Sequence, residues 1–206
     1  MESEKLRQKG LLVVVSAPSG CGKGTILAEI MKSDENYFSV SATTRAPRPG
    51  EVDGVNYHFL SREEFESRIA EERMLEYAEY CGNYYGTPAD EVEKQRRAGK
   101  NVFLEIEVQG AMQIRKKCPD AVFIFIVPPS VETLAERLRG RGTETEEVIA
   151  KRVAEARNEL LRAPDYDYII VNDDLDEAID DLRTVLRAEK MKTENSKEIL
   201  SEVIGK

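Results

Sequence analysis

The chain has 206 residues, 33% of them charged, and a net charge of -9. This length suffices for one α/β core with small additions. The acidic balance argues against nucleic acid as a partner, because backbone phosphates are usually met by a basic face. A membrane-spanning helix needs about 18 consecutive apolar residues, and no apolar run in the sequence is that long, so no membrane partner is expected. The sequence also shows no signal-peptide pattern. The cysteines Cys21, Cys81 and Cys118 lack metal-ligand spacing, which predicts reduced thiols and a cytoplasmic location.

The first predicted elements are a strand, a glycine-rich turn and a helix in direct succession. The apolar run 11–15 precedes Ser-Ala-Pro-Ser-Gly-Cys-Gly-Lys-Gly-Thr at 16–25, and helical spacing continues to about Ser33. Glycines let backbone N–H groups close on phosphate oxygens, and the helix start adds its dipole. A lysine here supplies a charge for the β- and γ-phosphates. The predicted nucleoside triphosphate site comprises Ala17, Pro18, Ser19, Gly20, Cys21, Gly22, Lys23, Gly24 and Thr25.

This loop departs from the usual phosphate-binding pattern at both ends. Ala17 stands where the pattern opens with glycine, and Gly24 stands where Ser or Thr follows the lysine. A hydroxyl for Mg²⁺ is therefore expected from Thr25, one position later. The alternative is an ordinary strand–turn–helix, which the clustered glycines and the lysine at the junction disfavour.

The next part of the chain predicts short elements. We expect a strand at 38–41, an irregular turn at 44–50, a turn and strand at 52–60, a helix opened by the capping box Ser61–Glu64, extended pieces at 74–85 and a helix at 87–98. Because residues 41–92 carry no long apolar strand, we expect them to form an inserted lobe.

The second half alternates apolar strands with helices. Strands are predicted at 102–107, 121–127 and 168–171, and helices at 111–117, 131–139, 143–161 and 175–203. Such alternation predicts a parallel sheet with right-handed crossovers. The charged stretch 134–161, with its glycine-flexed entry at Gly140 and Gly142, is typical of a mobile lid.

A second constellation suits a phosphate monoester. Arg45 and Arg48 flank Pro47 in a rigid turn, and two planar guanidinium groups at this spacing can bind one doubly charged phosphate. Tyr57 and Tyr85 can each offer a hydroxyl to the same group. From these residues alone, a solvated basic loop remains an equal alternative.

Together these segments resemble the guanylate kinases, which phosphorylate GMP with ATP. The matching blocks follow the family's order across residues 11–182 and lie at 16–25, 41–48, 50–57, 82–87, 105–110, 137–145 and 172–174. The resemblance implies a P-loop nucleoside triphosphate hydrolase-type fold of the α/β class, with a parallel sheet core flanked by helices. It implies one domain over 1–206, with its core at 10–40, 93–133 and 162–206, a GMP-binding lobe at 41–92 and a helical lid at 134–161.

The resemblance also implies the acceptor site, formed by Ser41, Arg45, Arg48, Tyr57, Glu76, Tyr85, Thr87 and Glu107. The arginines and tyrosines of this set would hold the phosphate, and the other residues would read the base. Guanine presents N1–H and N2–H₂ donors beside the O6 acceptor, so the Glu76 carboxylate can accept from both nitrogens while Ser41 and Thr87 donate to O6. AMP is therefore expected to be a poor acceptor.

The family's catalytic cations map onto Lys23, Arg45, Arg137, Arg141 and Arg152, although charged surface helices are the alternative for the lid. Asn172 would lie on the adenine side of ATP. Mg²⁺ is expected to arrive with ATP and to be held by phosphates and waters, with Thr25 and Glu105 (through water) as its protein contacts. Many relatives have Asp where this chain has Glu105 and Glu107. Glu105 is expected near the middle of its strand, with a buried structural acid as the alternative.

Two other functions compete with an ATP:GMP phosphotransferase. One is a non-catalytic guanylate-kinase-like module that binds a phosphopeptide, and the other is a kinase for a different small phosphate ester. The presence of Gly20, Gly22 and Lys23 in the loop and of Arg141 and Arg152 in the lid favours the enzyme, with ATP and GMP as its partners. The sequence carries no signal for oligomeric state.

Overall fold

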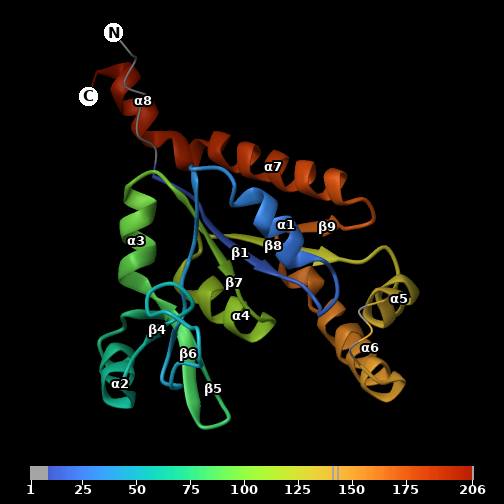
Figure 1. Cartoon of the computed structure of the whole chain (residues 1–206). Coiled ribbons are helices and arrows are strands. Elements are labelled where there is room, and N and C mark those ends of the chain that lie inside the picture. Colours follow the sequence, from blue (N-terminus) through green and yellow to red (C-terminus); the bar gives the residue numbers. More distant parts are fainter. Residues whose placement is uncertain (1–8, 141, 143, 206) are drawn as a thin grey trace.

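The computed structural model describes residues 9–140, 142 and 144–205, and a five-stranded sheet forms its centre (Figure 1). In their order across the sheet, the strands are β2 (Asn36–Phe38), β7 (Asn101–Glu105), β1 (Leu12–Ser16), β8 (Val122–Val127) and β9 (Tyr168–Val171). Every neighbouring pair is parallel, which confirms the predicted sheet. The carboxyl ends of all five strands therefore meet at one edge, where ligands bind in open α/β folds.

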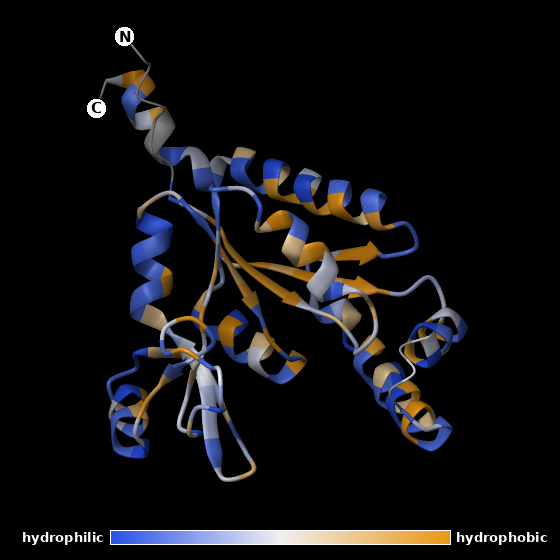
Figure 2. Cartoon of the chain, viewed as in Figure 1, coloured by the Kyte–Doolittle hydropathy of each residue, from blue (hydrophilic) through white to orange (hydrophobic). Residues whose placement is uncertain are grey.

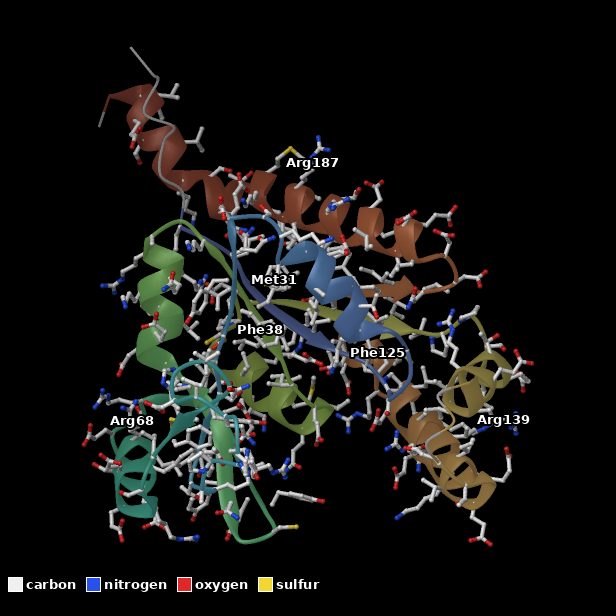
Figure 3. All side chains as sticks on the ribbon, viewed as in Figure 1. Met31, Phe38, Arg68, Phe125, Arg139 and Arg187 are labelled. Carbon is white, nitrogen blue, oxygen red and sulfur yellow. The ribbon has the colours of Figure 1, made fainter. Side chains whose placement is uncertain are left out.

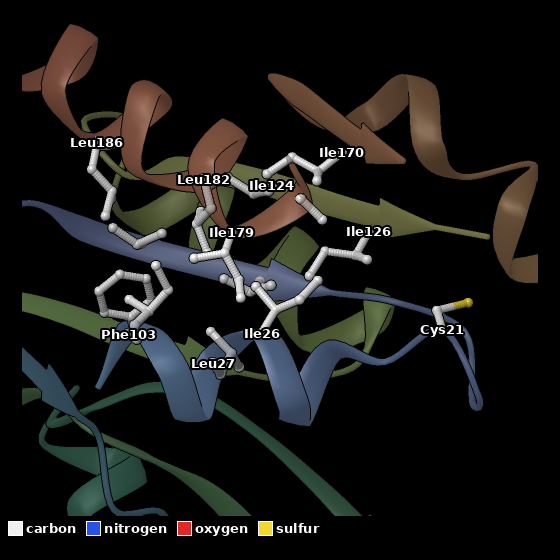
Figure 4. Close-up of a cluster of buried hydrophobic side chains, with 14 of the residues drawn as sticks. Cys21, Ile26, Leu27, Phe103, Ile124, Ile126, Ile170, Ile179, Leu182 and Leu186 are labelled. Carbon is white, nitrogen blue, oxygen red and sulfur yellow. The ribbon is translucent and has the colours of Figure 1, made fainter. Parts of the chain in front are cut away.

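Helices cover both faces of this sheet. Residues of α1 (Lys23–Ile30) and α7 (Leu175–Met191) share one buried cluster with Val13 and Val15. Figure 4 shows Ile26 of α1 and Leu182 of α7 within this cluster. Residues of α3 (Ala89–Arg97) and α4 (Val108–Lys117) share the other cluster with Leu12 and Val14. Successive side chains of a strand point to opposite faces, so a strand covered on both faces must be apolar throughout. Figure 2 shows the result as apolar strands beneath helices whose outer surfaces are hydrophilic.

A second, four-stranded sheet lies within residues 42–88. Its order is β4 (His58–Phe59), β3 (Ala42–Thr43), β6 (Asn83–Pro88) and β5 (Met74–Tyr80), with α2 (Arg62–Ala70) beside it. The predicted capping box of α2 is confirmed, since the Ser61 side chain accepts from the backbone N–H of Glu64 and the Glu64 side chain accepts from that of Ser61.

The predicted strand at 38–41 is wrong. Phe38 ends β2 in the parallel sheet and Ala42 begins β3 in the second sheet, so residues 39–41 form the crossing between them. The partners explain the division, because the Ser39 N–H donates to the carbonyl of Phe103 in one sheet while Ala42 pairs with Gly86 in the other. Because the residues on either side of 39–41 pair in different sheets, a single strand does not form here.

The helices α5 (Val131–Gly140) and α6 (Glu146–Leu160) lie across the molecule from the second sheet. Figure 3 marks the two sides with Arg68 on α2 and Arg139 on α5. The helix predicted from 131 ends at Gly140, while Arg141 and Thr143 lie outside the described residues. The remaining elements are η1 (Ala163–Asp165), η2 (Thr193–Ser196) and α8 (Lys197–Ile204). Among the described helices, none has both the length and the apolarity that crossing a bilayer requires.

Candidate active site

The loop between β1 and α1 lines a cavity of about 540 Å³ together with Glu105, Glu107, Val108 and Glu159. Lys23 is the first residue of α1, and Gly22 caps the helix with φ 81° and no side-chain hydrogen bond. The first-turn N–H groups of a helix have no intrahelical acceptor, so an uncapped start offers them to a bound anion. All nine loop residues predicted from 17 to 25 line this cavity.

Asn172 supports this loop from the end of β9. Its buried side-chain amide donates to the carbonyl oxygen of Cys21 at 2.7 Å. A Cβ on Gly22 would lie only 2.3 Å from that amide nitrogen, so the close approach requires glycine. In this structure the Asn172 amide therefore holds the phosphate loop, a role that the sequence did not indicate.

Cys21 packs into the main core beneath the loop and is fully buried. Burial raises the pKa of its thiol to about 12, although the nearby Arg137 and Lys23 oppose that shift. A thiol in this environment stays protonated and acts as a small apolar residue.

Glu105 and Glu107 line the phosphate-loop cavity together with Lys23. Glu105 is the last residue of β7 rather than a mid-strand residue, and its Oε1 lies 3.4 Å from Lys23 Nζ. Glu107 caps α4 two residues later. Glu105 is exposed, so the alternative of a buried structural acid is wrong.

The residues around the loop fit a magnesium ion that arrives with its nucleotide. The exposed Thr25 hydroxyl and the Glu105 carboxylate are hard oxygen donors of the kind that Mg²⁺ prefers. Within the described residues no group of three or more His, Cys, Asp or Glu side chains could hold a metal by itself. The ion would therefore draw most of its ligands from phosphate and water.

Two further cavities adjoin the first. One, of about 310 Å³, is lined by Lys23, Ser41 and Tyr57, and the other, of about 410 Å³, by Ser41, Tyr57, Glu76 and Tyr85. Glu105 and Glu107 line all three cavities. The structure thus brings the phosphate loop and most of the predicted acceptor residues to adjoining cavities that share Glu105 and Glu107.

Glu76 lines the last of these cavities and lies almost buried, with 7% of its surface exposed. The hydroxyl of the buried Thr87 donates to Glu76 Oε1 at 2.7 Å, and a Cβ on Gly110 would lie 2.9 Å from Oε2. Burial raises the pKa of the Glu76 carboxyl, while the hydrogen bonds from Thr87 oppose the shift. The Thr87 hydroxyl therefore orients the carboxylate in this structure.

The arginines of the Arg45–Arg48 turn do not line these cavities. Arg45 makes two hydrogen bonds with Glu51, at 3.0 and 2.9 Å, and its guanidinium carbon lies 5.5 Å from the centre of the Tyr57 ring. Glu51 also accepts from the backbone N–H of Arg48 at 2.7 Å, and these bonds lower the pKa of its carboxyl. The Arg48 side chain is exposed.

Glu51 is a residue of this site that sequence reasoning missed. An acidic residue six positions after Arg45 and three after Arg48, inside one turn, was the available signal. Its bonds hold the Arg45 guanidinium and the Arg48 backbone N–H in this turn, with Arg45 against the Tyr57 ring.

Of the three arginines predicted for the lid, the two that the structure describes make different contacts. Arg137 donates to the backbone oxygens of Asn172 at 2.9 Å and Asp173 at 3.4 Å. Arg152 pairs with Glu144 at 2.7 Å and donates to Ser19 of the phosphate loop at 3.4 Å. Arg141 lies outside the described residues.

Glu159 of α6 is a second residue that the sequence did not single out. It lines the phosphate cavity, and both burial and the neighbouring Glu107 raise the pKa of its carboxyl. Its position in the last turn of a charged helix gave no sign that it would face the loop.

The fold and the phosphate loop together define the class of protein. A central parallel strand that leads through a lysine-bearing glycine loop into a helix is the arrangement of P-loop kinases. The sequence model of the family described as guanylate kinase matches residues 9–189. The chain belongs to the guanylate kinase family.

Individual relatives agree with this assignment. The chain is 53% identical to guanylate kinase of Desulfitobacterium hafniense over 182 residues, which cover 88% of this chain and 91% of the relative. It is 56% identical to guanylate kinase of Streptococcus pneumoniae over 186 residues, which cover 89% of each. The crystal structure of guanylate kinase from Anaplasma phagocytophilum superposes with a TM-score of 0.71 at 35% identity, covering 95% of both chains.

Proposed function

We propose that this protein transfers the γ-phosphoryl group of ATP to the phosphate of GMP, giving ADP and GDP. The observation that carries the proposal is that Glu105 and Glu107 line both the phosphate-loop cavity and the cavity that contains Glu76. A donor and an acceptor nucleotide bound in these two cavities would meet at Lys23. Phosphoryl transfer depends mainly on such alignment and on charge neutralisation.

At the donor end, the residues from Ala17 to Thr25 would bind the ATP phosphates through backbone N–H groups and the Lys23 ammonium. Asn172 would keep the loop in shape beside the adenine side. Arg137, Arg141 and Arg152 would place positive charge on the transferring group when the lid closes. Closure would also exclude water and so prevent hydrolysis of ATP.

At the acceptor end, Arg45, Arg48, Tyr57 and Tyr85 would hold the GMP phosphate in line with ATP. The GMP phosphate is already an anionic nucleophile, so no residue has to remove a proton from it. Glu76, oriented by Thr87, would accept from N1 and N2 of guanine, while Ser41 and Glu107 complete the contacts to the base. A base that leaves Glu76 unpaired would lose about 10⁴-fold in turnover.

The proposed cofactor is Mg²⁺, which would neutralise charge on the β- and γ-phosphates when it binds with ATP. Glu105, through water, and Thr25 are the residues that would hold it. The proposed organisation is one domain over 1–206, with a core of 10–40, 93–133 and 162–206, a GMP-binding lobe of 41–92 and a lid of 134–161. The cytoplasm, where both nucleotides and reduced thiols are found, is the proposed location.

A coupled assay of ADP release with GMP, AMP, CMP and UMP as acceptors tests the proposal. We expect rapid turnover of GMP alone. Equal turnover of AMP would contradict the assignment of Glu76 to the base. If no monophosphate were turned over, the non-catalytic phosphopeptide module would become the better interpretation.

A further inference from the structure

We propose that Gln113 is a positioning residue that sets the selectivity for the acceptor base. It would act by tying the strand that carries Glu76 to the helix that begins at Glu107. This inference rests on the proposed function, because it assumes that Glu76 and Glu107 contact the same nucleotide. Gln113 contacts neither cavity and acts through the backbone of Tyr77.

The contact is a pair of hydrogen bonds between a side-chain amide and a backbone amide. The Tyr77 N–H donates to Gln113 Oε1 at 3.2 Å, and Gln113 Nε2 donates to the Tyr77 carbonyl at 3.0 Å. β5 is an edge strand of the second sheet, so its backbone groups that face away from β6 have no strand partner. The Gln113 amide satisfies both groups of Tyr77, the residue directly after Glu76.

Two further contacts place the same face of α4 against β5. Gly110, one turn before Gln113, lies against the Glu76 carboxylate so closely that a Cβ would stand 2.9 Å from Oε2. Lys117, one turn after it, donates to the carbonyl oxygen of Met74 at 2.8 Å. Residues at these spacings lie on one side of a helix, so α4 contacts β5 along a continuous line.

Because α4 starts directly after Glu107, this line of contacts fixes the separation between the two carboxylates. A helix is rigid over this length, whereas the pairing of β5 with β6 has a register irregularity between Met74 and Glu76, so the ladder is interrupted next to Glu76. Without the Gln113 amide, the Glu76 carboxylate would lose its register with Glu107. Guanine needs both carboxylates in register, whereas adenine lacks the donors that Glu76 accepts.

The test is the variant Gln113→Met, which keeps the length of the side chain and removes both hydrogen bonds. We expect the KM for GMP to rise about fivefold to tenfold, with kcat at saturating GMP and the KM for ATP unchanged. The ratio of kcat/KM for GMP over AMP should fall by the same factor. In a Glu76→Gln background, the added effect of Gln113→Met should be less than about twofold, because residues that act through each other are not additive.

Lys116→Met is the matched control, since Lys116 is an exposed neighbour on α4, and it should leave every constant unchanged. If Gln113→Met lowers only the thermal midpoint while the KM for GMP and the GMP-to-AMP ratio stay at wild-type values, the inference is wrong. Should that variant not fold, Gln113→Glu retains the acceptor for Tyr77 N–H and should show an intermediate KM, and a wild-type KM would refute the inference. Wild-type protein that does not distinguish GMP from AMP would instead refute the proposed function.

Discussion

The side-chain amide of Asn172 binds the carbonyl oxygen of Cys21 at 2.7 Å and so joins the end of β9 to a loop 151 residues earlier in the chain. The same nitrogen stands where a side chain on Gly22 would begin. The shape of the phosphate loop therefore depends on a contact from the opposite end of the sequence.

Substitution of Gly22 by alanine should destabilise the protein. The left-handed φ of 81° costs an alanine about 1–2 kcal/mol, and its methyl group would displace the Asn172 amide. For a chain of this size, we expect the midpoint of thermal unfolding to fall by at least about 2 °C. Gly24→Ala is the matched control, because its Cβ would meet nothing within 4 Å and its helical position favours alanine. Equal midpoints for the two variants would contradict the steric explanation.

Lys23→Met should reduce kcat/KM by about 10²-fold or more, since it removes the cation proposed to neutralise the transferring phosphate. The measurement is steady-state turnover of GMP at saturating ATP. Lys32→Met is the control for a general loss of charge, because Lys32 pairs with Glu29 at the surface away from the loop. A loss of less than about tenfold would remove Lys23 from the catalytic role.

Arg152→Met should lower kcat by about 10²-fold while the KM values for both nucleotides change little, because the proposed role of this arginine is to stabilise the transferring group rather than to bind either nucleotide. The adjacent Lys151 is exposed and pairs only loosely with Glu155, at 3.9 Å, so Lys151→Met provides a matched control. An equal loss of kcat in both variants would indicate a general effect of charge on α6.

The KM for GMP should fall as the pH rises through the raised pKa of Glu76, because guanine donates its hydrogen bonds to the ionised carboxylate. Glu76→Gln should bind GMP more weakly and show a KM that hardly depends on pH. Initial rates over a pH series give both profiles. A pH-independent KM in the wild type would argue that Glu76 does not read the base.

The same residue should couple pH to stability. A carboxyl whose pKa is raised in the folded protein stabilises the fold below its unfolded pKa, and this contribution disappears as the pH rises through the folded pKa. Glu76→Gln should therefore increase the free energy of unfolding at neutral pH, and the gain should shrink in acid. Urea unfolding of both proteins at two pH values measures the difference. A variant that is less stable than wild type at neutral pH would show that the Thr87 hydrogen bond outweighs burial.

The sequence predicted the parallel core well because its strands are bounded by strong local signals. The strand 168–171, for example, was predicted with its observed bounds, since an apolar run lies between turn-forming residues. The second sheet was not predictable in the same way. Its pair β3 and β6 joins residues about 40 positions apart, and a two-residue strand such as Ala42–Thr43 has no pattern of its own.

The hydrogen-bond and ion-pair partners of the site residues were likewise not predictable from the sequence. Helical spacing suggested a face for Arg137, but its acceptors are backbone oxygens of Asn172 and Asp173 that tertiary packing brings near. The family motif indicated Glu76 and Arg45, whereas Thr87 and Glu51 emerged as their partners only when the strands and turns were in place. Motifs in the sequence indicate which side chains belong to the site, whereas tertiary packing determines which groups those side chains contact.

The three cysteines differ in accessibility, so one of them can carry a reporter group selectively. Burial raises the pKa of Cys21 to about 12, so its thiol stays protonated at neutral pH, and the buried sulfur is not exposed to reagents. Burial also raises the pKa of Cys118, whereas Cys81 is exposed between β5 and β6. A thiol-reactive dye would therefore mark the hairpin that carries Glu76 on one side and Thr87 on the other. Fluorescence from that dye would report the surroundings of this hairpin in an otherwise unmodified chain.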